Sequence, residues 1–194
     1  ERRQSQPPQH GVREAPGIIW VWIYDYDWGL ANAVLRWLGL SALEQSWLGQ
    51  PSTALWSVLV AHEWKWLGFN MIVFLAALHA LPEDVLGAAE LDNCGWIAKL
   101  VYIIVPMLRT TTMNLTVLSF IGKMMVFDLI WVMTGGGPLW STETVSTYVY
   151  KRAFEWNTFD LGYPSAIAVL RFVIILAFVA IVSRVGRARD RIEF

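Results

Sequence analysis

Residues 82–96 read PEDVLGAAELDNCGW, a short polar and acidic segment between two long apolar runs. Pro82 suits the first turn of a helix, where Glu83 and Asp84 lie close to the positive end of the helix dipole. The residues that follow at helical spacing form one nearly flat face, made by Val85, Ala88, Ala89 and Asp92. Such a helix is suited to lie in a groove of another protein, and a plain connecting helix explains the shape equally well.

The composition of the whole chain indicates a membrane protein. Hydrophobic residues make up 56% of the 194 residues and charged residues 16%, whereas an ordinary soluble domain is about 25% charged. The net charge of −1 gives no field that would attract nucleic acid. Cys94 is the single cysteine, so neither an intrachain disulfide nor a zinc-binding cysteine cluster is possible. Several of the 12 tryptophans flank apolar runs, which is typical of rings at the membrane interface.

Three apolar runs are long enough to cross a bilayer. We expect membrane-spanning helices over residues 53–78, 106–134 and 161–183, because about 20 helical residues cross the hydrocarbon core. The chain is therefore predicted to be an all-α membrane protein, with the acidic segment in the loop between the first two spans.

Before the first span, the apolar runs are too short to cross a bilayer or the sequence is more polar. Residues 17–24 are apolar but too few to cross, and we interpret them as the remnant of a further span. Residues 25–52 include an amphipathic stretch from Leu30 to Leu38, which is typical of an interfacial helix and loop. Residues 1–16 are rich in proline, glutamine and charge, which predicts disorder.

Arginines predict the orientation of the chain in the membrane. The third span is followed by a cluster formed by Arg184, Arg187, Arg189 and Arg191. Because arginine and lysine gather on the cytoplasmic side, the C-terminus with its tail at 188–194 is predicted to be cytoplasmic. Counting the spans backwards places residues 79–105 in the cytoplasm as well.

The acidic segment also matches a family pattern. Ala88-Ala89, then Leu91 to Cys94 with Trp96, then IIVP at 103–106 resemble the EAA loop of permease subunits in bacterial binding-protein-dependent ABC importers. The family pattern is Glu-Ala-Ala-x-x-x-Gly-x-x-x-x-x-x-x-x-x-Ile-x-Leu-Pro. The positions in register are Ala88, Ala89, Ile103 and Pro106.

Two positions depart from that pattern, and other stretches support it. Gly87 stands where the family has Glu, and Asn93 stands where it has Gly. Glycine weakens a helix interior by about 1 kcal/mol, whereas asparagine tolerates the left-handed conformation. Further matches resemble the sugar-permease branch, MalF-like or UgpA-like: DWGLANAVLRWLGL at 27–40, WLGFNMIVFLAAL at 66–78, FDLIWVMTGGGP at 127–138 and STETVSTYVYKRAFEWNTFDLGYPSAIAV at 141–169.

The resemblance implies the helical bundle of a type I ABC importer permease over residues 17–187, with an EAA-type coupling loop at 80–106. In such importers the EAA helix lies in a cleft of the ATPase subunit and couples it to the membrane helices. Carried over by position, the residues expected to contact the ATPase are Ala88, Ala89, Leu91, Asp92, Asn93 and Trp96.

The resemblance further implies a permease subunit that moves a sugar or related polyol across the bacterial inner membrane into the cytoplasm. The implied partners are a second, MalG-like permease, two ATPase subunits that bind Mg-ATP, and an extracytoplasmic binding protein. No cofactor is expected on this chain. Because the family usually has six spans, the resemblance also indicates an N-terminal truncation. A nonfunctional remnant, a natural short form and an excerpted chain all stay open.

A catalytic role finds little support in the residues. HEWKW at 62–66 begins like the zinc-protease pattern HExxH, but Trp66 occupies the second ligand position, which disfavours a membrane-embedded metalloenzyme. Gly122-Lys123 resembles the end of an ATP-binding loop, yet Val117 replaces its first glycine. The glycines at 135–137 are better explained as a turn. We therefore expect a transport subunit rather than an enzyme.

Charged residues inside the predicted spans indicate the translocation route, because an ionisable side chain at the bilayer centre costs about 2.5–3.5 kcal/mol and faces protein or water. Glu63 and Arg171 each lie about 15 Å from the outer end of their spans, so we predict an ion pair near the midplane. His62, Lys65 and Asn70 are expected to offer polar groups to a sugar. The alternative is that these side chains, like Lys123 and Asp128, only pair with one another or reach for the membrane surface.

Overall fold

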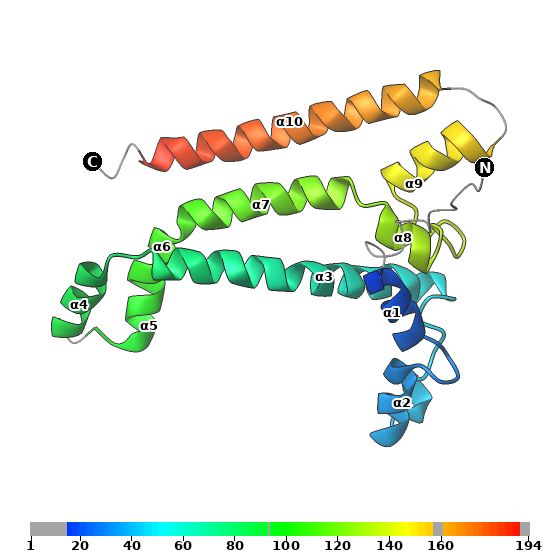
Figure 1. Cartoon of the computed structure of the whole chain (residues 1–194), viewed down its shortest axis with the longest axis horizontal. Helices are drawn as coiled ribbons and strands as arrows, with labels where there is room; N and C mark the ends of the chain where they lie inside the picture. The colour runs from blue at the N-terminus through cyan, green and yellow to red at the C-terminus, as the bar shows by residue number, and fades with distance from the viewer. Residues whose placement is uncertain (1–14, 93, 157–160, 191–194) are drawn as a thin grey trace, which may run out of the picture. The chain divides into compact units, whose positions relative to one another are not determined.

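The computed structural model describes residues 15–92, 94–156 and 161–190 of the chain (Figure 1). In that part of the chain every regular element is helical, which confirms the predicted all-α class. The α-helices are α1 (Ala15–Ile23), α2 (Leu30–Trp37), α3 (Pro51–His79), α4 (Glu83–Leu91), α5 (Trp96–Lys99), α6 (Val105–Met107), α7 (Arg109–Met124), α8 (Asp128–Met133), α9 (Val145–Tyr150) and α10 (Gly162–Asp190). Short turns of other helix types are η2 (Ser41–Leu43), η3 (Leu100–Ile104) and η4 (Lys151–Glu155).

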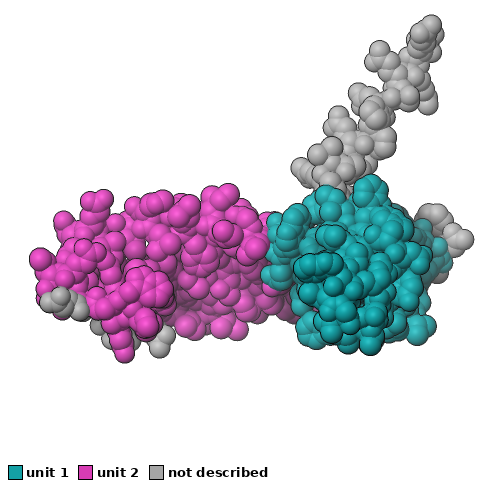
Figure 2. All heavy atoms as spheres, turned by 90° about the horizontal axis from the view of Figure 1, so that it is seen from below, with its two compact units in different colours: residues 1–65, 125–168 teal, residues 66–124, 169–194 magenta. Residues whose placement is uncertain are grey.

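The chain forms two compact units (Figure 2). Unit 1 comprises residues 1–65 and 125–168, and unit 2 comprises residues 66–124 and 169–194. The two long helices, α3 and α10, each contribute residues to both units.

The core of unit 1 lies where α1 packs against α8. Buried apolar side chains of α3 and α8 form it, namely Val58, Ala61, Leu129, Ile130 and Met133. Gly17 in α1 allows a close approach to α8, because a Cβ at this position would lie 3.2 Å from Val132 Cγ1. The apolar remnant at the start of the chain is therefore a packed part of the fold.

The start of α1 corrects one expectation. The helix begins at Ala15, so Ala15 and Pro16 are helical rather than disordered. Proline is tolerated in the first turn because the N–H that it lacks would have no helical partner there. The rest of the predicted disorder, at 1–14, lies outside the described residues.

The glycine run forms the predicted turn in unit 1. Gly135 and Gly136 have φ angles of +59° and +90°, a region that glycine adopts most easily. Thr142, which is fully buried, donates its hydroxyl to the Gly137 carbonyl at 2.7 Å and lies 2.7 Å from the Thr134 hydroxyl. These hydrogen bonds hold the turn in place before α9 begins.

Unit 2 is organised by the packing of α7 against the C-terminal part of α10. The rings of Phe120 and Phe178 are stacked with centroids 3.7 Å apart. Gly186 is buried, and a Cβ there would lie 2.5 Å from Met113 Cε, so only glycine fits this contact without a shift. Arg109 Nη2 donates to the Val185 carbonyl at 3.5 Å. The two helices are thus joined along several turns.

The expected span at 106–134 is not one continuous helix. α7 ends at Met124 and α8 begins at Asp128, after Phe127 with φ −137° and ψ −62°. Contacts from elsewhere in unit 1 explain this break. Thr144 Oγ1 donates to the Val126 carbonyl at 3.4 Å, and the Phe127 ring packs against the Tyr150 ring with centroids 5.2 Å apart.

Helix length and composition identify the candidate membrane spans. α10 is long and apolar enough to cross a membrane by itself, over Gly162–Gly186. Two further candidates are bent helix pairs, Pro51–His79 with Glu83–Leu91 at 71° and Trp96–Met107 with Arg109–Met124 at 62°. The described residues therefore hold one candidate span, or up to three if each bent pair counts as one. The predicted division of the chain into domains and spans stays a prediction.

Candidate functional site

The acidic segment forms the short helix α4 of unit 2. Pro82 precedes it in an extended conformation, with φ −60° and ψ 126°, and the acids Glu83 and Asp84 occupy its first turn. Two carboxylates near the positive end of the helix dipole stabilise the start of the helix. The local sequence therefore sets where this helix begins.

The residues predicted to contact an ATPase differ in their exposure. Leu91 is 86% exposed and Trp96 is 75% exposed, and Ala88 and Asp92 are exposed as well. Ala89 is only 5% exposed, so its methyl group faces the interior of unit 2. Because adjacent residues of a helix point in different directions, exposed Ala88 and buried Ala89 lie on different sides of α4. Asn93 lies outside the described residues.

An ion pair joins α4 to α5. Lys99 Nζ donates to Glu90 Oε1 at 2.7 Å. This hydrogen bond and the positive charge of Lys99 lower the pKa of the Glu90 carboxyl below its ordinary value of 4.5. The contact holds the two short helices together while their apolar side chains remain exposed.

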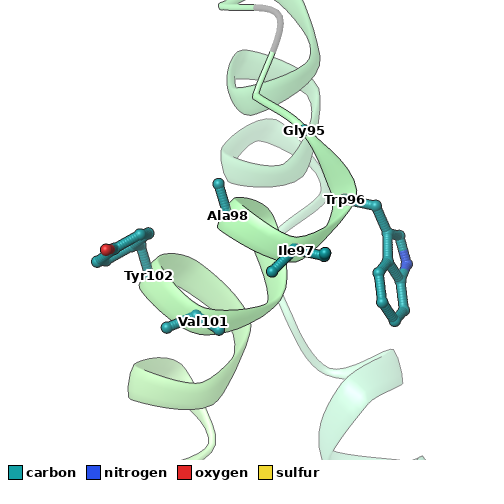
Figure 3. Close-up of a pocket in the computed structure, with 6 residues that line it drawn as sticks. All are labelled: Gly95, Trp96, Ile97, Ala98, Val101 and Tyr102. Atoms are coloured by element: carbon teal, nitrogen blue, oxygen red, sulfur yellow. The ribbon is translucent and has the colours of Figure 1, made fainter.

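An open hollow of about 720 Å³ follows α4. Its lining comes from α5, η3 and the preceding glycine: Gly95, Trp96, Ile97, Ala98, Val101 and Tyr102. Figure 3 shows Trp96 and Tyr102 pointing to opposite sides, with Ile97 and Val101 between them. Sequence reasoning identified Trp96 alone of this group, although the spacing of Ile97, Val101 and Val105 would have indicated an apolar helix face.

Gly87, which replaces the Glu of the family pattern, lies on the exposed surface of α4. Among the described residues, no atom beyond the adjacent residues and the surrounding backbone of α4 lies within 4 Å of the place a Cβ would occupy. A larger side chain would therefore fit, and packing within unit 2 does not require glycine here.

The polar residues predicted to line a translocation route are divided between the two units. In unit 1, His62 Nδ1 lies 3.8 Å from Glu63 Oε1, and Lys65 is exposed. Asn70 and Arg171 belong to unit 2, and both are half-buried. The predicted ion pair between Glu63 and Arg171 would join different units and stays a prediction.

Asn70 lines an open pocket of about 400 Å³ within unit 2. Its polar lining also includes Thr112, Thr116, Ser119 and Lys123, and its apolar lining consists of Phe74, Leu115, Phe120 and Phe178. The hydroxyls of Thr112 and Thr116 donate to the carbonyls four residues earlier, at 3.0 and 2.8 Å, which leaves their oxygen lone pairs as acceptors. Sequence reasoning missed this row of hydroxyls, although it follows one face of α7 at helical spacing.

Metal-binding side chains do not cluster in the described part of the chain, where no group of three or more His, Cys, Asp or Glu residues could hold an ion. In α3, Trp66 stands at the position where a zinc-binding helix of this pattern would place its second histidine.

The family of the chain follows from comparison with known proteins. Residues 16–190 match the family described as "Binding-protein-dependent transport system inner membrane component". Since the match covers most of the chain, the protein belongs to this family, which confirms the predicted resemblance.

Relatives with named substrates are permease proteins. The chain is 35% identical over 170 residues to the trehalose/maltose transport system permease protein MalF of Thermococcus litoralis, which covers 88% of this chain and 56% of that protein. It is 31% identical over 174 residues to the sulfoquinovosyl glycerol transport system permease protein SmoG of Agrobacterium fabrum, covering 90% and 55%. The chain spans about half the length of these relatives.

A solved structure shows the same fold. A chain of a bacterial alginate ABC transporter, solved in complex with its alginate pentasaccharide-bound periplasmic protein, matches with a TM-score of 0.78 at 22% identity. The match covers 90% of this chain and 59% of that chain. The helical arrangement predicted from the resemblance, that of an ABC importer permease, is therefore confirmed.

Proposed function

We propose that this chain forms the permease part of an ABC importer that moves a sugar or related carbohydrate into the cytoplasm. The observation that carries the proposal is the family match over residues 16–190, together with relatives named for trehalose and maltose and for sulfoquinovosyl glycerol. The other parts of the importer would be a second permease, two ATPase subunits and an extracytoplasmic binding protein. The C-terminus would lie in the cytoplasm.

Coupling to the ATPase would use the exposed surface of α4 and α5. Burying an apolar side chain of the size of leucine is worth about 1.5–3 kcal/mol, so Leu91 and Trp96 would gain from entering a groove of a partner. Ala88 and Asp92 would complete this contact, and Ala89 would support it from inside unit 2. Mg-ATP would be bound by the ATPase subunits, and this chain would bind no cofactor.

The substrate would pass the pocket that contains Asn70. Hydroxyl and amide groups there offer donors and acceptors to carbohydrate hydroxyls, and the phenyl rings of Phe74, Phe120 and Phe178 offer apolar surface to the faces of sugar rings. His62, Glu63, Lys65 and Arg171 are proposed as further polar groups along the route. A polyhydroxylated substrate requires both hydrogen-bonding groups and aromatic rings, and this pocket contains both.

Carbohydrate uptake by the assembled transporter tests the proposal. Proteoliposomes with both permeases, the ATPase and the binding protein would be assayed with radiolabelled maltose, trehalose and related oligosaccharides. We expect ATP-dependent uptake of at least one carbohydrate, and we expect Thr116→Leu to lower it by filling the pocket. Thr111→Leu, on the same helix but outside the pocket lining, is the matched control. An assembled complex that hydrolyses ATP and takes up no carbohydrate would contradict the proposal.

A further inference from the structure

Helix α2 presents an apolar face that the described residues of unit 1 leave exposed. Along α2 and the residue that follows it, the exposed side chains recur at helical spacing: Leu30 at 62%, Val34 at 46%, Trp37 at 84% and Leu38 at 55%. Trp28, just before the helix, is 63% exposed. Residues at these spacings lie on one side of a helix, so the exposed surface is one continuous apolar face without an ionised group.

The opposite side of α2 is fixed by hydrogen bonds. Asn32 is fully buried, and its amide nitrogen donates to the carbonyls of Tyr26 and Gln45 at 3.1 and 3.2 Å. Its oxygen accepts from Trp47 Nε1 at 2.8 Å and from the Gln45 N–H at 3.4 Å. The Asn32 amide thus donates two hydrogen bonds and accepts two. Turning the apolar face of α2 inward would break these four hydrogen bonds, so they hold the orientation of the helix.

Arg36 reinforces the same orientation. Its guanidinium donates to Glu44 Oε2 at 3.0 Å and to the Asp27 carbonyl at 3.0 Å. The charges of Arg36 and Glu44 are therefore paired on the side of α2 away from Leu30, Val34, Trp37 and Leu38.

The same network fixes α2 beside the start of α3. The carbonyl of Trp47, the residue that bonds to Asn32, accepts hydrogen bonds from the hydroxyls of Thr53 and Ser57 in α3, at 3.0 and 3.3 Å. Figure 1 shows α2 to one side of the end at which α3 begins. The first turns of α3 are themselves apolar and exposed, with Trp56 at 67% and Leu55 at 51%.

We propose that α2 is an interfacial anchor whose face of Leu30, Val34, Trp37 and Leu38 is seated in the lipid of the leaflet in which α3 begins. The apolar surface of a membrane helix continues onto α2, and the boundary between lipid and water lies at the first turn of that helix. Tryptophan is the side chain most typical of this boundary, because its ring is apolar while its N–H can reach water. A short amphipathic helix held at this depth lies along the membrane surface with its apolar face toward the acyl chains.

A spin label tests whether lipid covers this face. In a Cys94→Ser background, single cysteines would be placed on the apolar face by Val34→Cys and Leu30→Cys. Asp27→Cys, an exposed polar position in the same unit, is the matched control. The labelled chains would be assembled with their companion subunits in vesicles of phosphatidylethanolamine and phosphatidylglycerol. Collision rates of the label with oxygen, which concentrates in lipid, and with a water-soluble nickel chelate would then be measured.

The proposal predicts an oxygen-to-nickel collision ratio several-fold higher at residues 34 and 30 than at residue 27. Equal ratios at all three positions would overturn it, because the face would then lie in water. Labels at 34 and 30 that are shielded from both reagents would overturn it as well, since a protein surface would then cover the face. Two labelled positions keep the test valid if one substitution lowers expression.

Discussion

The loop at residues 134–156 and the proposed coupling segment at residues 83–104 both consist of short helices and turns, yet they differ in the charged side chains that they bury. In the loop, Lys151 and Glu143 form an ion pair at 3.1 Å with side chains only 11% and 17% exposed. In the segment, which α4, α5 and η3 form, Leu91 and Trp96 are 86% and 75% exposed. The loop places charges inside, and the coupling segment places apolar surface outside.

The contacts around Lys151 explain how the loop tolerates a buried charge. Its ammonium group bonds to Glu143 and lies 4.9 Å from the centre of the Trp140 ring. Gly136 provides the space, because a Cβ there would lie 2.9 Å from Lys151 Nζ. The loop therefore satisfies its polar groups within unit 1. The coupling segment leaves Leu91 exposed and the loop leaves Leu139 exposed to a similar extent. The two regions therefore differ in the charged side chains that they bury, and the family pattern is what favours a partner at the coupling segment.

The largest expected effect comes from breaking the buried pair. Lys151→Met leaves the Glu143 carboxylate without its partner, and removing one member of a buried pair costs about 3–5 kcal/mol. We expect the free energy of unfolding in detergent to fall by this amount. Lys99→Met, which breaks the pair with the 73%-exposed Glu90, is the control and should change it far less. Equal effects of the two substitutions would contradict the contrast between the regions.

Glycine substitutions should have opposite signs in the two regions. Gly136→Ala places a side chain at φ +90° and against Lys151, which we expect to lower the free energy of unfolding by at least about 1–2 kcal/mol. Gly87→Ala in the exposed α4 meets no neighbouring atom and should raise helix stability by up to about 1 kcal/mol. Denaturant titration measures both changes. Stabilisation by Gly136→Ala would show that the turn is not constrained as described.

Removing exposed apolar surface from the coupling segment should hardly affect stability. Leu91→Glu replaces a side chain that touches little of unit 2, and surface substitutions usually stay within about 0.5 kcal/mol. We expect the thermal midpoint of the isolated chain in detergent to match that of the unmodified chain. A large loss of stability would mean that Leu91 packs against other residues of the chain and is not available to a partner.

The smallest effect is a pH dependence of the contact between α4 and α5. Lys99 lowers the pKa of Glu90 in the folded state, so the contact contributes its full stabilisation above the ordinary value of 4.5 and loses it as the pH falls through the lowered pKa. From pH 8 to pH 5 the ion pair stays formed, so the protection of the α4 amides against hydrogen exchange should not change. Exchange should then accelerate below that range, beyond its intrinsic pH dependence. Lys99→Met should abolish this acid-dependent change.

Much of the fold was predictable because local patterns determine it. The long apolar runs produce α3 and α10, and Pro82 with two acids defines the start of α4. The break between α7 and α8 was not predictable, because it depends on contacts of Val126 and Phe127 with residues far along the chain. Periodicity identifies a helix, but it does not show where a tertiary contact will interrupt one.

Only part of the candidate sites was predictable, because a sequence pattern does not show which side chains the fold buries or brings together. The family pattern indicated α4 and Trp96, but it did not distinguish exposed Ala88 from buried Ala89, since both follow the pattern equally. The hydroxyls of Thr112, Thr116 and Ser119 were missed because serine and threonine carry no charge and are easily overlooked in an apolar run. The burial of Lys151 depends on how the loop closes upon Glu143, which is eight residues away.

We propose that an ATPase binds the exposed apolar surface of the coupling segment and not that of the loop. Co-purification of the ATPase with this chain and its companion permease tests it most directly, comparing Leu91→Glu with Leu139→Glu. Leu139, in the loop, is 83% exposed and nearly matches Leu91 at 86%. We expect Leu91→Glu to remove the ATPase from the purified complex and Leu139→Glu to retain it. Retention of the ATPase by both variants, or its loss from both, would show that the coupling segment is not the ATPase-binding surface.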